Sequence, residues 1–106
     1  MSDQAPEIWL EFEWSTVDNT TTDDDDAFNM QIRLHNGRTY ALNVWTFKAL
    51  ERFHQTDTLT GDNLSGRYLI PPDLLVERLD RQIIEQIVTD IMRRKQLKDE
   101  WLVEDV

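Results

Sequence analysis

The acidic side chains near the start of the sequence are the residues whose types and spacing suggest chemistry. Residues 1–31 hold nine carboxylates and neither lysine nor arginine, and the first basic residue is Arg33. The chain has 21 acidic and 11 basic residues in all, so its formal net charge of −10 divides into −9 before Ile32 and −1 from there on. Such a field attracts cationic partners and opposes binding to nucleic acid or to an anionic membrane.

The four consecutive carboxylates Asp23, Asp24, Asp25 and Asp26 raise the question of a calcium site, because hard cations bind several carboxylate oxygens. A dedicated calcium loop spaces its ligands alternately and has a glycine where the chain turns sharply. No glycine lies between Asn19 and His35. We therefore expect a solvated loop without a metal site, with weak, non-selective binding of divalent cations as the alternative.

Glu11 and Glu13 are two residues apart, so on a strand their carboxyl groups would project from one face about 7 Å apart. This separation is near the range of the carboxylate pairs of glycosidases. Their mechanism also needs one acid in an apolar pocket and a cleft that holds sugar rings, which an exposed strand of a small chain does not offer. We predict that the protein is not an enzyme and has no catalytic residues.

The two histidines, His35 and His54, are the remaining candidates for a metal site, and no cysteine accompanies them. A zinc ion would have to recruit carboxylates from several loops, so we expect no metal and no cofactor. The absence of cysteine also fits a reducing compartment. Without a basic leader or an apolar run of about 18 residues, the chain is expected to be cytoplasmic and without a membrane contact.

Trp9 is the most informative aromatic residue, because alternation places it on the outer side of a strand among glutamates. Large aromatic rings flanked by charge are typical of protein interfaces, in which the ring supplies buried area and the carboxylates supply steering. The alternative is that residues 15–26 or Trp101 cover the ring. The predicted partner-binding set comprises Glu7, Trp9, Glu11, Glu13, Asp23, Asp24, Asp25 and Asp26.

The elements that position these residues begin with strands. Apolar residues alternate over 8–14, which predicts a half-buried strand, and again on both sides of Asn36-Gly37, which predicts a hairpin over 28–45. A two-residue turn would place the two apolar sets on opposite faces of the sheet. A three-residue turn with Gly37 in the left-handed conformation pairs Ile32 with Tyr40 and puts both sets on one face, so we predict this bulged hairpin.

Two helices follow in the predicted order of elements. Thr46 can cap a short helix over 46–54 that turns Phe47, Leu50 and Phe53 inward, and Asp80 can cap a longer one over 80–95. The longer helix carries an apolar stripe composed of Ile83, Ile84, Ile87, Val88, Ile91 and Met92. Between the helices we expect a brief strand at 68–70 and an extended segment at 74–79.

This order predicts an α+β fold, with an antiparallel sheet of about four or five strands covered on one face by the long C-terminal helix. Residues 1–106 are expected to form a single domain, in which 15–27 is an acidic solvated loop and 103–106 an acidic tail. Whether the protein is a monomer or a homodimer stays open.

Two stretches have a familiar pattern: GRTYALNVWTF at 37–47 and YLIPPDLLV at 68–76. With the Asp80-capped helix, they resemble a group of small, uncharacterised bacterial α+β proteins that are similar to the immunity proteins of contact-dependent and polymorphic toxin systems. The resemblance covers about residues 28–95 and its motifs are structural. It implies a cytosolic, often acidic inhibitor that occludes a toxin domain, and it assigns no functional residues.

Two hypotheses on function follow from the sequence. In the first, the chain is an acidic immunity-type inhibitor that occludes a basic partner, such as a toxin nuclease, through its carboxylate-rich face. In the second, it is a small accessory or self-associating protein whose acidity serves solubility only, with a homodimer through an exposed strand edge as one form.

Overall fold

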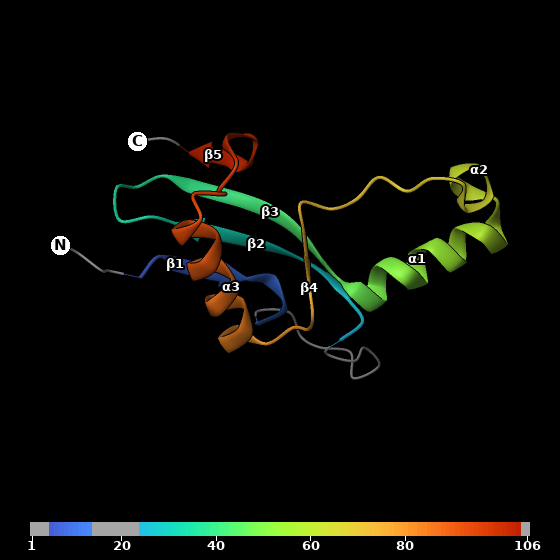
Figure 1. Cartoon of the computed structure of the whole chain (residues 1–106), viewed down its shortest axis with the longest axis horizontal. Helices are drawn as coiled ribbons and strands as arrows, with labels where there is room; N and C mark the ends of the chain where they lie inside the picture. Colours follow the sequence, from blue (N-terminus) through green and yellow to red (C-terminus); the bar gives the residue numbers. More distant parts are fainter. Residues whose placement is uncertain (1–4, 14–23, 105–106) are drawn as a thin grey trace.

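The computed structural model describes residues 5–13 and 24–104, which form an α+β structure (Figure 1). This confirms the predicted fold class. The strands are β1 (Glu7–Leu10), β2 (Ala27–Arg33), β3 (Thr39–Thr46), β4 (Leu74–Val76) and β5 (Leu102–Glu104). The helices are α1 (Phe47–Thr60), α2 (Asp62–Gly66) and α3 (Arg81–Arg93), with single 3-10 turns at Glu11–Glu13 and Asp99–Trp101.

The β2–β3 hairpin has the predicted register. Ile32 lies opposite Tyr40, and Leu34 N donates to Arg38 O at 2.8 Å across the three-residue turn. Gly37 has a φ of 90°, a conformation that a residue with a Cβ adopts only at a cost in energy. The pattern of apolar residues was therefore sufficient to identify the turn, because only this register buries both apolar sets together.

The sheet has the order β1-β2-β3-β4, and β5 pairs with the other end of β3. All pairs are antiparallel except β3–β4, in which Val44 lies beside Leu74 and Thr46 beside Val76 in the same direction. The sequence predicted an antiparallel partner here. The connection of residues 47–73 is 27 residues long, which is ample for the crossover that parallel strands require.

The core lies between one face of the sheet and α3, which crosses that face (Figure 1). Asp80 caps α3, since its side chain accepts from Gln82 N at 2.9 Å and from Ile83 N at 3.2 Å. From the predicted stripe, Ile84 and Val88 are fully buried. They pack against the inward-facing residues of the first three strands, namely Leu10, Phe28, Met30, Ile32, Tyr40, Leu42 and Val44.

The first strand is shorter than predicted, because it ends at Leu10 and gives way to the turn Glu11–Glu13. Continued pairing would set the backbone of Glu11 opposite Asn29. The Glu11 side chain accepts from Asn29 N at 2.9 Å instead, so a carboxylate replaces the backbone acceptor. Trp14 lies outside the described residues.

The connection between β3 and β4 also differs from the prediction. Helix α1 continues to Thr60, where Gly61 with a φ of 87° ends it, and residues 68–70 form no strand. Phe47 was expected to face inward and is 58% exposed, whereas Ala49 is fully buried. Helix α1 projects beyond the sheet, so much of its surface faces solvent, while Phe53 packs on Trp45 and His54 and Asp57 contact residues of α2 (Figure 1).

Thr46 joins three parts of the fold, because its buried hydroxyl accepts from Ala49 N and from Asp26 N, both at 3.1 Å. We predict that Thr46→Val lowers the free energy of unfolding by about 1–3 kcal/mol, since it removes the α1 cap and leaves one buried and one partly buried donor without a partner. Thr46→Ser keeps the oxygen and should lose less than half as much. Urea unfolding of both variants checks this, and equal losses would contradict the role of the hydroxyl.

In the described part of the chain, no helix has the length and apolar character needed to cross a membrane.

Candidate functional site

Trp9 lies on the face of the sheet that α3 does not cover. Its register partners there are Gln31 on β2 and, one strand further, Ala41 on β3. The indole is 39% exposed, and Trp101, one of the two segments expected to cover it, is instead buried in the core. Most of the segment 15–26, which was the other segment expected to cover the ring, lies outside the described residues.

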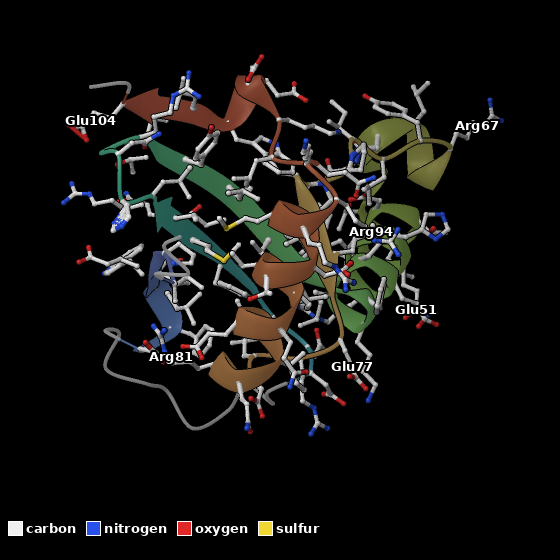
Figure 2. All side chains as sticks on the ribbon, turned by 60° about the vertical axis from the view of Figure 1, so that its left-hand side comes forward. Glu51, Arg67, Glu77, Arg81, Arg94 and Glu104 are labelled. Carbon is white, nitrogen blue, oxygen red and sulfur yellow. The ribbon has the colours of Figure 1, made fainter. Side chains whose placement is uncertain are left out.

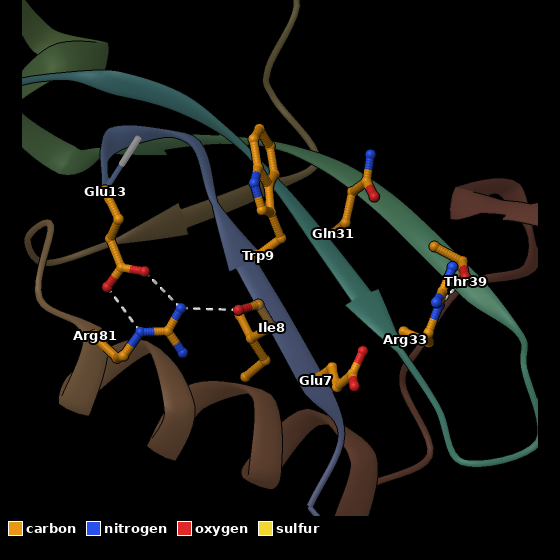
Figure 3. A pocket seen from close by; sticks show the side chains of 8 residues that line it. All are labelled: Glu7, Ile8, Trp9, Glu13, Gln31, Arg33, Thr39 and Arg81. Atoms are coloured by element: carbon orange, nitrogen blue, oxygen red, sulfur yellow. Dashed lines mark hydrogen bonds and ion pairs between the residues drawn. The ribbon is translucent and has the colours of Figure 1, made fainter. Parts of the chain in front are cut away.

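A shallow hollow of about 450 Å³ surrounds this tryptophan (Figure 3). Glu7, Gln31 and Arg33 line it on the outer face of the sheet, and Arg33 and Thr39 form the row opposite Glu7. These side chains offer one carboxylate, one amide and one guanidinium around an aromatic ring. Such a mixture of polar groups and aromatic surface is typical of a protein interface.

Arg81 closes the other side of the hollow and holds Glu13 (Figure 3). Its Nη2 and Nε donate to the two carboxylate oxygens of Glu13, both at 2.7 Å, and Nη2 also donates to the carbonyl of Ile8 at 2.8 Å. The hydrogen bonds from Arg81 lower the pKa of Glu13 below its ordinary value of 4.5. The same bonds raise the pKa of Arg81, so the guanidinium stays charged.

This contact also acts on the sheet, because β1 is an edge strand. The Ile8 carbonyl would otherwise be an acceptor for a strand from another molecule, and Arg81 occupies it. Short edge strands with a charged side chain on the edge are a common protection against edge-to-edge pairing.

The aspartate run makes intramolecular contacts at the base of α1. Asp24 Oδ2 lies 3.0 Å from Lys48 Nζ, and Asp25 Oδ1 accepts from Arg52 Nε at 2.8 Å. The hydrogen bond to Asp24 raises the pKa of Lys48. Asp26 Oδ1 accepts from Ala27 N at 2.8 Å. These carboxylates therefore fasten the start of β2 to α1.

The structure thus separates the predicted partner-binding residues into two groups. Glu11, Glu13, Asp24, Asp25 and Asp26 all have intramolecular partners, and Asp23 lies outside the described residues. Glu7 and Trp9 are exposed, lie beside each other on β1 and line the same hollow. These two remain the candidate contact residues.

Sequence reasoning missed Arg81, Gln31 and Arg33. The alternation of β2 contained the signal for the last two, since it places Gln31 and Arg33 on the face opposite Ile32. Arg81 is the first helical residue after the Asp80 cap, which gave its position on the helix. Its contact with Glu13, 68 residues earlier, had no signal in the sequence.

The histidines do not form a shared site in the structure. His54 Nε2 lies 2.9 Å from the carbonyl oxygen of Gly66, and His35 lies in the hairpin turn. Over residues 5–13 and 24–104, no cluster of three or more histidine, aspartate or glutamate side chains is arranged to hold a metal ion.

The Glu13–Arg81 contact predicts a pH dependence of stability. A carboxyl group whose pKa is lower in the folded state stabilises fully above its unfolded value near 4.5, and this contribution disappears as the pH falls through the folded value. We therefore expect Glu13→Gln to lower the free energy of unfolding by about 1 kcal/mol at pH 7 and by much less at pH 3.

Urea unfolding between pH 7 and pH 3 measures this difference. Glu85→Gln is the matched control, because Glu85 accepts a single bond from the same guanidinium, at 3.1 Å, and should cost less. A loss for Glu13→Gln that does not change with pH would show that the charge of Glu13 is not the stabilising feature.

No family model, curated protein or solved structure matches the chain. The likeness to immunity proteins therefore stays a prediction. Any function must be inferred from the charges, exposures and contacts of the chain's own residues.

Proposed function

We propose that this protein is a non-enzymatic, acidic binding protein of the immunity type, which occludes a basic protein partner such as a toxin domain. The observation that supports this proposal best is the exposed indole of Trp9 beside the carboxylate of Glu7, on a sheet face that none of the described helices covers. Tryptophan in such a position is costly to leave in water and is among the residues that contribute most to protein interfaces.

The charge of the chain indicates the kind of partner. A net charge of −10 on 106 residues repels acidic partners at long range and accelerates association with basic ones. Ion pairs within the molecule weaken the long-range electric field of the individual carboxylates, but they do not change this net charge. In the proposed complex, Trp9 and Glu7 make contact, while the other predicted acidic residues contribute to the long-range field.

The outer face adds hydrogen-bonding groups for such a partner. Asn29, Gln31 and Asn43 are exposed on neighbouring strands and project to the same side as Trp9. Their amides can donate and accept without carrying charge. The face would therefore combine one aromatic anchor with a polar surround, as interfaces of non-obligate complexes do.

The second hypothesis, a self-associating protein that pairs through a strand edge, receives less support. The bond from Arg81 to the Ile8 carbonyl occupies part of the β1 edge, and Asp73 contacts the backbone of β3 beside β4. Asp73 Oδ2 accepts from Asn43 N at 2.8 Å, which satisfies a donor that another strand would need. We therefore propose the outer face of β1, and not its edge, as the functional surface.

The test begins with affinity capture on the immobilised full chain from a lysate of the source cell, washed at low and then at high salt. We expect one basic protein that is retained at low salt and released as salt rises. The partner is then purified for kinetic measurements. An empty eluate from folded protein would favour the solubility hypothesis.

Kinetics with the purified partner then test the face itself. Trp9→Ala should raise the dissociation rate about tenfold or more with little change in the association rate. Glu7→Lys should lower the association rate and its dependence on salt. Val103→Ala is the matched control, because it truncates an apolar side chain that is 61% exposed on β5. Unchanged kinetics for both Trp9→Ala and Glu7→Lys would rule out this face.

A further inference from the structure

Residues 47–70, here called the arm, carry most of the exposed apolar surface. In the described part of the chain, seven large apolar side chains are exposed, and five of them belong to the arm. The exposed fractions reach 88% for Leu59, 76% for Ile70 and 68% for Leu64. Figure 1 shows that α1 and α2 project from the end of β3, away from α3 and from both chain ends. Apolar residues concentrated in this way mark an interaction surface.

The groove beside α1 extends this surface. A hollow of about 350 Å³ lies between α1 and the segment that returns toward β4, and Trp45, Phe53, Leu69 and Ile70 contribute its apolar walls. Trp45 and Phe53 pack edge to face with ring centroids 4.8 Å apart. Part of the apolar surface is therefore concave and rests on fixed aromatic rings.

The end of the arm has a defined shape. Asn63, Leu64 and Ser65 have φ values of 53°, 55° and 59°, which form a left-handed turn that costs about 1–2 kcal/mol per residue. Two side chains of α1 hold this turn: Asp57 Oδ2 accepts from Asn63 Nδ2 at 2.8 Å, and His54 contacts the Gly66 carbonyl. The fold thus sustains an unfavourable backbone conformation that leaves Leu64 exposed.

The charge of the arm indicates which molecule covers it. The arm contains three basic residues (Lys48, Arg52, Arg67) and three acidic ones (Glu51, Asp57, Asp62), so its formal net charge is zero in a chain of −10. A basic partner is attracted to the remainder of the chain and has no electrostatic preference for the arm. Two copies of the chain therefore meet no net repulsion between the formal charges of their arms.

The arm is also complementary to itself. Glu51 lies near the start of α1 and Arg67 directly follows α2, so the two side chains are at opposite ends of the arm (Figure 2). Neither forms an ion pair with another described residue. In a two-fold dimer the same patch meets itself in reversed order, which brings Glu51 of one copy to Arg67 of the other.

We propose that the arm is a self-association surface, through which two copies of this chain pair in antiparallel orientation about a two-fold axis. The exposed apolar side chains supply the buried area and the two Glu51–Arg67 pairs fix the orientation. Because the arm is narrow, the interface belongs to the small class, and the dimer is weak and reversible. This surface is separate from Trp9 and Glu7, so the inference does not depend on the proposed function.

Sedimentation velocity over about 5–500 µM of the full chain tests the proposal. We expect the weight-average mass to rise from monomer toward dimer with concentration. Dimerisation should strengthen as salt increases, because salt screens the repulsion between two chains of charge −10. This direction is opposite to that expected for binding a basic partner. A monomer over the whole range at high salt would overturn the proposal.

Substitutions of exposed residues locate the surface without a large effect on folding. Leu59→Ser with Ile70→Ser should weaken dimerisation at least tenfold, with thermal unfolding at dilute concentration unchanged. Val103→Ser is the matched control, because Val103 is 61% exposed and lies on β5, outside the arm. A dimer that Val103→Ser weakens and the arm variant does not would place the interface elsewhere.

A charge exchange tests the antiparallel orientation. Glu51→Arg and Arg67→Glu should each weaken the dimer, since each substitution places two like charges opposite each other at both ends of the interface. The double variant restores opposite charges and should recover dimerisation to near that of the original chain. Single variants that weaken the dimer without recovery in the double variant would contradict the antiparallel pairing.

Discussion

The packing of α3 onto one face of the sheet is the interaction on which the rest of the structure depends. Ile84 and Val88 are fully buried against residues from the first three strands, and this is the main apolar burial that opposes a net charge of −10. This packing also fixes the pairing register of the strands that face α3. A shift by one residue would turn the apolar side chains of a strand to the outer face of the sheet. The outer face, with Trp9 and the polar side chains around it, is the consequence of that choice.

The carboxylates have a structural role as well as an electrostatic one. Glu13 joins the end of β1 to the start of α3 through Arg81, and Asp24 and Asp25 join the start of β2 to α1 through Lys48 and Arg52. Each pair is partly exposed, so each contributes little alone. Together they connect segments that the core does not reach. An acidic sequence therefore does not present all of its charge to a partner.

The two proposed surfaces differ in character, and electrostatics would keep their proposed partners apart. The face around Trp9 belongs to a strongly acidic part of the chain, and we propose a basic protein as its partner. The arm is exposed and apolar with a formal net charge of zero, and we propose a second copy as its partner. Salt acts on the two in opposite directions, since it weakens attraction between unlike charges and relieves repulsion between like ones. In an antiparallel pair, α1 and α2 would be covered while β1 stayed accessible, because the arm projects away from the sheet (Figure 1).

Local patterns in the sequence determined the α+β class, the bulged hairpin, the Asp80 cap and the buried stripe of α3. Each depends on residues within a few positions of one another, for which alternation, helical periodicity and turn geometry are sufficient. The same alternation placed Trp9 on the outer side of its strand but left open whether another segment covers the ring. The tertiary structure decided which carboxylates have partners, where β1 ends, that β4 runs parallel to β3, and that α1 projects as an arm. These features depend on contacts such as Glu13 with Arg81, which join residues far apart in the chain and leave no periodic trace in it.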